Sequence, residues 1–187
     1  MQAAPIVVVA SSAQDLEAIV ELLSALPVNG HYAVVIVQHR DEGRRSVPLN
    51  DALAARVSHP VLVAKAGVRP ESGHIYVMRA DAELTIINGL ISVIPGTDTL
   101  RNPGDRLLTS LARDCGSRAI GIVLSGGGSD GALGVRAINK TGGTTFAQYP
   151  GSARFPSMPI GAIETGCVGR VLRPNEIARE LVRAIPG

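Results

Sequence analysis

Short apolar runs alternate along the chain with segments whose apolar residues recur at helical spacing. The runs are rich in Val, Ile and Ala and too short for helices, so they predict buried strands. The segments between them end near proline or glycine and predict helices. Expected strands are 6–10, 33–38, 61–64, 119–124, 144–147 and 168–172; expected helices are 14–26, 47–56, 104–115, 131–140 and 174–184, with a helical turn at 159–165. This alternation predicts an α/β fold, a doubly wound, mostly parallel sheet with helices on both faces and an antiparallel hairpin.

The hairpin is expected in the middle of the chain, where the pattern changes. Three short apolar runs, 74–78, 84–87 and 90–94, replace the longer alternation, and Asn88-Gly89 separates the last two. An Asn-Gly pair between two apolar runs favours a tight hairpin turn. We therefore predict that this whole stretch is antiparallel, as an insertion or an edge of the sheet.

Composition limits the classes of protein to consider. The length of 187 residues suits one domain, and 18 basic against 16 acidic residues are too balanced for a general nucleic-acid binder. Aromatic residues are only 3% of the chain, which argues against base-stacking platforms. Cys115 and Cys167 lack neighbours at metal-ligand spacing and are expected to be free thiols. No apolar stretch reaches membrane-spanning length and no signal peptide is evident, so we expect a cytoplasmic protein without membrane insertion.

Three reactive residues directly follow three of the predicted strands. Ser11 comes after 6–10, His39 comes after 33–38, and Asp130 follows 119–124 in the run Ser125-Gly126-Gly127-Gly128-Ser129-Asp130-Gly131. The carboxyl ends of parallel strands lie at one edge of a doubly wound sheet, where ligands bind. A serine nucleophile, a histidine base and an aspartate that orients the histidine are the groups that acyl transfer needs. The pattern therefore predicts one site that holds Ser11, His39 and Asp130.

Each of these residues also has a purely structural interpretation. Serine is a favoured helix N-cap, Ser12 with Asp15 resembles a capping box, and the pattern alone does not separate Ser11 from Ser12. Asp130 has the position of an N-cap for the helix expected from 131, and a lone histidine at a strand end is commonly a polar surface residue. The glycine-rich run lacks the Lys-Ser or Lys-Thr of a P-loop, so it is not one.

Several blocks of sequence, taken in order, resemble the catalytic domain of the chemotaxis protein-glutamate methylesterases (CheB-type), particularly the version found in hybrids with methyltransferase domains. The resemblance extends over nearly the whole chain, and its strongest block runs from Gly121 to Ala137. The other blocks are Ala10-Ser11, Leu16-Glu17-Ala18-Ile19, Val37-Gln38-His39, 73–77, 105–108, Gly142-Gly143, Phe146-Ala147-Gln148, Met158-Pro159 and 162–166.

The resemblance implies that the family's nucleophilic serine falls on Ser11 rather than Ser12, its histidine on His39 and its aspartate on Asp130. It implies hydrolysis of glutamate γ-methyl esters on chemoreceptors or receptor-like coiled coils, with release of methanol, and deamidation of particular receptor glutamines. Oxyanion donors are expected around Gly127 and among the N–H groups after Ser11. No metal or organic cofactor is implied, and we expect residues 1–187 to form this one catalytic domain, without a receiver domain.

Val9, Ala13 and Gln14 stand where the family has glycines, and this departure supports a second hypothesis. In that hypothesis the chain is a degenerate, non-catalytic module with the same fold that binds a receptor helix through Arg44, Arg45, Arg101 and Arg154. A third interpretation is an acyl hydrolase for a small ester. The esterase hypothesis is favoured, because a module without chemistry does not need the serine, the histidine and the aspartate together.

Overall fold

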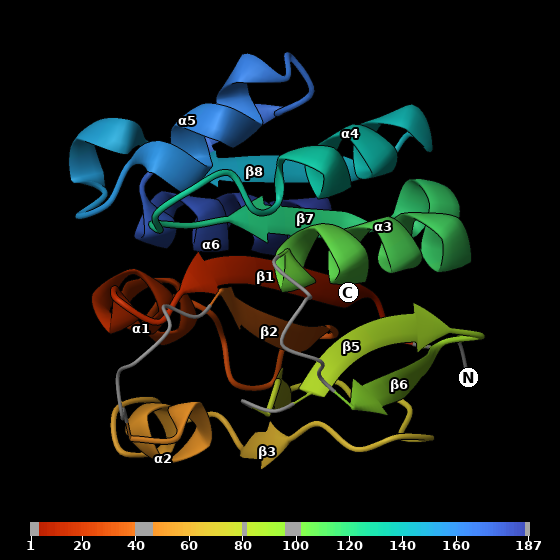
Figure 1. Ribbon diagram of the computed structural model, residues 1–187. Helices are drawn as coiled ribbons and strands as arrows, with labels where there is room; N and C mark the ends of the chain where they lie inside the picture. The colour runs from red at the N-terminus through yellow and green to blue at the C-terminus, as the bar shows by residue number, and fades with distance from the viewer. Residues whose placement is uncertain (1–3, 40–46, 80–81, 96–101, 186–187) are drawn as a thin grey trace.

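In the computed structural model the fold is described for residues 4–39, 47–79, 82–95 and 102–185, with the backbone alone at His39. Its main sheet has seven strands, in the order β3-β4-β2-β1-β7-β8-β9, and every pair of neighbours is parallel. The strands are β1 Ile6–Ser12, β2 Ala33–His39, β3 Val61–Val63, β4 Ile75–Val77, β7 Ile120–Val123, β8 Thr144–Gln148 and β9 Arg170–Leu172. The predicted doubly wound α/β fold is thus confirmed (Figure 1).

Helices cover both faces of this sheet (Figure 1). They are α1 Leu16–Ser24, α2 Leu49–Ala54, α3 Pro103–Cys115, α4 Ala132–Lys140, α5 Ser157–Glu164 and α6 Pro174–Ala184, with short 3₁₀ turns at Gly116–Arg118 and Pro150–Ser152. No helix in these described ranges is long and apolar enough to cross a membrane.

The side chains of β1 alternate between two hydrophobic cores, because successive residues of a strand point to opposite faces. Val8 and Ala10 pack into the core formed with α3, α4 and α5. Val7 and Val9 pack into the core formed with α1 and α6. Every residue of β1 is buried, as expected for a parallel strand covered on both sides. The continuous apolar run in the sequence is therefore the consequence of two cores that share one strand.

The central strand β1 is also the point where the winding direction reverses. From β1 the sheet continues to β2, β4 and β3 on one side, and to β7, β8 and β9 on the other. At such a switch point the connections leave the carboxyl edge in opposite directions, and ligands of doubly wound proteins bind there. The end of β1 and the segment after β7 lie next to each other at this point of the sheet.

The hairpin forms where Asn88-Gly89 predicts it, but the prediction for the run at 74–78 is wrong. Strands β5 (Ala82–Ile87) and β6 (Leu90–Pro95) pair antiparallel, and Asn88 and Gly89 both have positive φ, 54° and 70°. The run at 74–78 instead supplies β4, which lies parallel between β2 and β3 in the main sheet. A run of three buried residues carries no local mark of its direction, which is decided by the crossover connection.

Candidate active site

The structure places Ser11 and His39 inside their strands rather than just after them. Strand β1 includes both Ser11 and Ser12, and β2 ends at His39. The register pairs Ser11 with Gln38 and Ser12 with His39. The Ser12 N–H donates to the Ser125 carbonyl, 3.1 Å away, which ties the end of β1 to the segment after β7. All three predicted residues therefore belong to the carboxyl edge at the switch point, although the side chain of His39 lies outside the described part of the chain.

Ser11 and Ser12 differ in what their hydroxyl groups do. Both residues are 1% exposed. The Ser12 hydroxyl accepts from the Gln14 N–H at 3.2 Å, whereas the Ser11 Oγ has no hydrogen-bond partner among the described residues. The N-cap of α1 is Asp15 rather than either serine, and its carboxylate accepts from the Ala18 N–H at 3.4 Å. Since a buried hydroxyl without a partner costs free energy, the uncommitted Ser11 hydroxyl is the better candidate nucleophile.

The alternation of side chains along β1 favours Ser12 in one respect, because it places Ser12 on the face of the sheet where Asp130 lies. If the alternation of Val7 to Ala10 continues to the end of β1, Ser12 faces the same core as Ala10, and Ser11 faces the core of α1. Asp130 is beside Ala10, because a Cβ built on Gly104 would lie 2.9 Å from the Ala10 Cβ and 3.0 Å from each Asp130 carboxylate oxygen. Both serines must therefore be tested in any assignment of the nucleophile.

Asp130 caps a helix, but not the helix that the sequence suggests. Its side chain is buried and accepts from the Gly104 N–H at 2.9 Å and from the Asp105 N–H at 2.8 Å. These are the first free amides of α3, whose own N-cap residue, Asn102, makes no side-chain cap bond. Helix α4, which follows Asp130, has Gly131 as its N-cap residue. The amides of α3 hold both carboxylate oxygens, so the Asp130 carboxylate has a fixed orientation.

The amides of the glycine-rich turn at this edge differ in whether they have a hydrogen-bond partner. The Ser125 N–H donates to the Gln148 Oε1 at 2.8 Å, and the Gly126 N–H donates to the Phe155 carbonyl at 2.8 Å. The N–H groups of Gly127, Gly128 and Ser129 have no partner among the described residues, and the space beside Gly127 is open. Among the N–H groups after Ser11, that of Ser12 is bonded to the Ser125 carbonyl and is not free to serve as an oxyanion donor. Gly127 remains the candidate donor.

The residues that replace family glycines are placed differently from one another. The Val9 side chain is fully buried in the core of α1 and α6. Ala13 is exposed and Gln14 is half-buried, and the backbone N–H of Gln14 donates to the Ser12 hydroxyl. Val9 therefore contributes to packing, and Gln14 contacts the candidate site through this backbone hydrogen bond.

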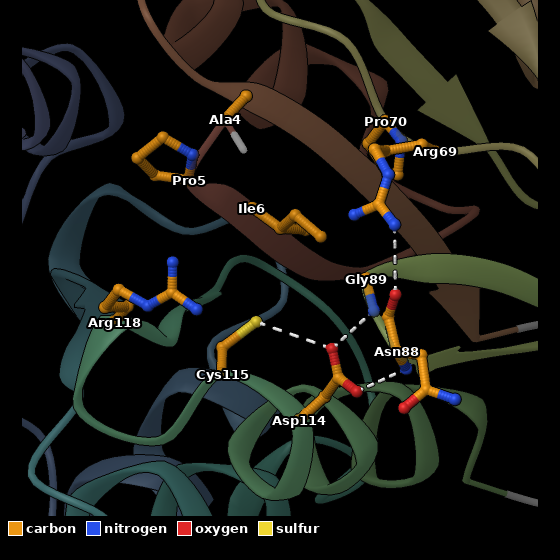
Figure 2. A pocket seen from close by; sticks show the side chains of 10 residues that line it. All are labelled: Ala4, Pro5, Ile6, Arg69, Pro70, Asn88, Gly89, Asp114, Cys115 and Arg118. Atoms are coloured by element: carbon orange, nitrogen blue, oxygen red, sulfur yellow. Dashed lines mark hydrogen bonds between the residues drawn. The ribbon is translucent and has the colours of Figure 1, made fainter. Parts of the chain in front are cut away.

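A pocket of about 260 Å³ lies at the opposite edge of the sheet (Figure 2). Ile6, the first residue of β1, and Asp114 and Cys115, at the end of α3, contribute to its wall. The Asp114 carboxylate accepts from the backbone N–H groups of Asn88 and Gly89. These two hydrogen bonds hold the hairpin turn against α3. The other lining residues are Ala4, Pro5, Arg69, Pro70 and Arg118. This pocket is remote from Ser11 and Asp130, and we assign it no part in their chemistry.

Two further residues of the site were not predicted from the sequence. Gln148 holds the Ser125 amide with its Oε1 and donates from its Nε2 to the Ser152 carbonyl at 3.1 Å. Asp105 accepts from the first amides of α4. The sequence shows Asp105 at the start of the family block 105–108 and as an acid in the first turn of a helix, a common position that does not indicate its partner. The α4 amides that its carboxylate binds are more than 25 residues further along the chain, and only the packing of α3 against α4 brings them together.

The fold and the carboxyl edge define a class, doubly wound α/β proteins with candidate acyl-transfer residues at the switch point. Residues 7–181 match the model of the CheB methylesterase family, and the chain belongs to this family. Among curated proteins it is 34% identical over 180 residues to protein-glutamate methylesterase/protein-glutamine glutaminase 3 of Paramagnetospirillum magneticum, covering 95% of this chain and 50% of that protein. It is 33% identical over 178 residues to protein-glutamate methylesterase/protein-glutamine glutaminase 2 of Anaeromyxobacter dehalogenans, covering 94% of this chain and 52% of that protein.

Among solved structures, the crystal structure of the Thermotoga maritima CheB methylesterase catalytic domain superposes with a TM-score of 0.85 at 26% identity. The match covers 98% of this chain and all of that one. The chain spans about half the length of the curated relatives it matches. The family and the fold class that the sequence predicted are both confirmed.

Proposed function

We propose that this chain is a protein-glutamate methylesterase that hydrolyses glutamate γ-methyl esters on chemoreceptors or receptor-like coiled coils, releasing methanol. Membership of the CheB methylesterase family supports the reaction class. The observation that carries the proposal is the uncommitted, buried Ser11 hydroxyl at the same sheet edge as the Asp130 carboxylate, whose two oxygens are held by α3. Deamidation of receptor glutamines by the same residues would release ammonia instead of methanol. The cytoplasmic location expected from the sequence stays a prediction.

In this proposal Ser11, His39 and Asp130 act as a triad. The Ser11 Oγ attacks the ester carbonyl while the His39 imidazole takes the hydroxyl proton, and the Asp130 carboxylate stabilises the imidazolium. The Gly127 N–H donates to the oxyanion of the tetrahedral intermediate. The intermediate collapses when His39 returns the proton to the methoxy oxygen, so methanol leaves and an acyl-Ser11 ester remains. Water, deprotonated by His39, then hydrolyses that ester and regenerates the serine.

The test is methanol release from a methylated receptor cytoplasmic fragment, with wild type, Ser11→Ala and Ser12→Ala side by side. We expect Ser11→Ala to lower the rate by about a thousandfold or more, because the attacking oxygen is removed. Ser12→Ala removes a hydroxyl of the same size from the next residue and is expected to keep most of the rate. Loss of activity in Ser12→Ala with retention in Ser11→Ala would assign the nucleophile to Ser12 and refute the proposed mechanism.

The same assay decides the alternative of a non-catalytic receptor-binding module. Of the four arginines named for that alternative, only Arg154 is in the described part of the chain, and Arg44, Arg45 and Arg101 lie outside it. The Arg154 guanidinium is 5.4 Å from the centre of the Phe155 ring, in a cation–π contact, and the residue is exposed. Folded wild-type protein that binds the fragment but releases no methanol from it would favour this alternative.

A further inference from the structure

The N-termini of α3 and α4 are capped crosswise by two buried aspartates. Asp130 directly precedes the N-cap residue of α4, yet its carboxylate accepts from Gly104 and Asp105 in the first turn of α3. Asp105 belongs to α3, yet its Oδ1 accepts from the Gly131 and Gly134 amides at the start of α4, both at 2.9 Å. Neither helix has a side-chain cap from its own N-cap residue, so each depends on the aspartate of the other.

We infer that Asp105 is a positioning residue for Asp130, and this inference rests on the proposed function. Asp105 reaches Asp130 by two routes. Its backbone N–H donates to one Asp130 carboxylate oxygen, and its side chain holds the N–H of Gly131, the residue that follows Asp130 in the chain. The carboxylate and the backbone of Asp130 are therefore both anchored to the first turn of α3.

The surroundings leave the Asp130 carboxylate little freedom to adopt another position. A Cβ built on Gly104 would lie 3.0 Å from both carboxylate oxygens, so the start of α3 packs directly against them. Asp105 and Asp130 are only 8% and 1% exposed, so water does not readily replace a lost hydrogen bond. If the Asp105 carboxylate is removed, the Gly131 and Gly134 amides lose their acceptor. The start of α4 then has no cap to hold it, and Asp130 moves with it.

The two carboxylates also interact through their charges. Burial raises the pKa of Asp105, the negative charge of Asp130 raises it further, and the bonds from the α4 amides act in the opposite direction. The positive ends of two helix dipoles meet here and favour the ionised carboxylates. Asparagine at 105 would keep an oxygen acceptor for the α4 amides without the charge, which separates the geometric role from the electrostatic one.

The experiment compares Asp105→Ala and Asp105→Asn with Ser110→Ala as the control. Ser110 is in the same helix, and its Oγ accepts from the Ile86 N–H at 2.9 Å, so this variant also leaves a backbone amide without an acceptor, but away from Asp130. We expect Asp105→Ala to lower kcat about tenfold to a hundredfold at nearly unchanged KM, the scale of a displacement approaching 1 Å. We expect Asp105→Asn to recover most of that loss, and Ser110→Ala to lose stability while kcat stays unchanged.

A second measurement does not depend on turnover. The titration of the His39 ring is followed by NMR in wild type, Asp105→Ala and Asp130→Asn. A carboxylate beside the imidazole favours its charged form, so the midpoint should move to lower pH in Asp130→Asn and by a part of that amount in Asp105→Ala. The acid limb of the kcat/KM profile should move in the same direction.

These measurements separate failure of the inference from failure of the proposed function. If the wild type folds but releases no methanol, the proposed function fails, and the NMR titration still decides the role of Asp105. An unmoved His39 midpoint in Asp105→Ala, with stability lowered as in Ser110→Ala, would reduce Asp105 to a helix cap and overturn the inference. If Asp105→Ala fails to fold, Asp105→Asn carries the test. Asp105→Asn would then also overturn the inference if it lowered kcat as far as Asp130→Asn does.

Discussion

Gly104→Ala is the smallest change that should move the Asp130 carboxylate. The new Cβ would lie 3.0 Å from both Asp130 oxygens and 2.9 Å from the Ala10 Cβ, closer than ordinary van der Waals contact. Asp130 or the start of α3 must therefore move by a few tenths of an ångström. Since a displacement of about 1 Å at a catalytic group costs on the order of a hundredfold in rate, this smaller shift should lower kcat by about fivefold to tenfold.

The effect on stability should be modest, which makes the variant informative. Overpacking costs about 1–3 kcal/mol, and alanine in place of glycine in a helix returns up to about 1 kcal/mol. The control is Gly121→Ala, whose Cβ would lie 2.5 Å from the Ile138 Cδ1 and 2.8 Å from the Leu108 Cδ2 and is not close to Asp130. It overpacks the same core without touching the carboxylate.

The assay is kcat for methanol release, together with the urea midpoint of both variants. We expect both to lose stability and only Gly104→Ala to lose kcat. Full kcat in Gly104→Ala would show that the position of the Asp130 carboxylate does not limit the reaction. An equal loss of kcat in Gly121→Ala would attribute the effect to general loosening of the core, and either result would refute the reasoning.

Two further predictions concern stability. Burial lowers the pKa of His59, so below pH about 6.5 the unfolded chain binds a proton that the folded chain does not, and stability falls as the pH falls. His59→Gln should therefore flatten the fall in the urea midpoint between pH 7 and pH 5, and equal slopes for the two proteins would contradict this. Gln148→Leu should cost about 1–3 kcal/mol, because it leaves the buried Ser125 amide without an acceptor. Denaturation of this variant beside wild type measures the cost, and unchanged stability would mean that another acceptor takes over.

Much of the fold could be predicted because its cause is local. Runs of apolar residues produce strands wherever both faces are covered, so β1, β2 and β7 were each located to within two residues at each end. Asn88-Gly89 specifies its turn through the positive φ that these two residues tolerate. The family was recognisable for a related reason, since some of its blocks, such as Ala10-Ser11, Val37-Gln38-His39 and Phe146-Ala147-Gln148, lie at strand ends, where backbone geometry and candidate chemistry restrict the residue types.

Other features were decided only by tertiary structure. The residues of β4 would be apolar whether the strand ran parallel or antiparallel to its neighbours. Its parallel position between β2 and β3 depends on how the chain crosses over. Whether Asp130 caps the helix next to it or a distant one depends on which amides packing brings within 3 Å, and these belong to α3. Composition and spacing thus determined which elements form and which residues reach the carboxyl edge. The partners of those residues were decided by contacts about 25 positions apart, for which a single sequence carries no local physical signal.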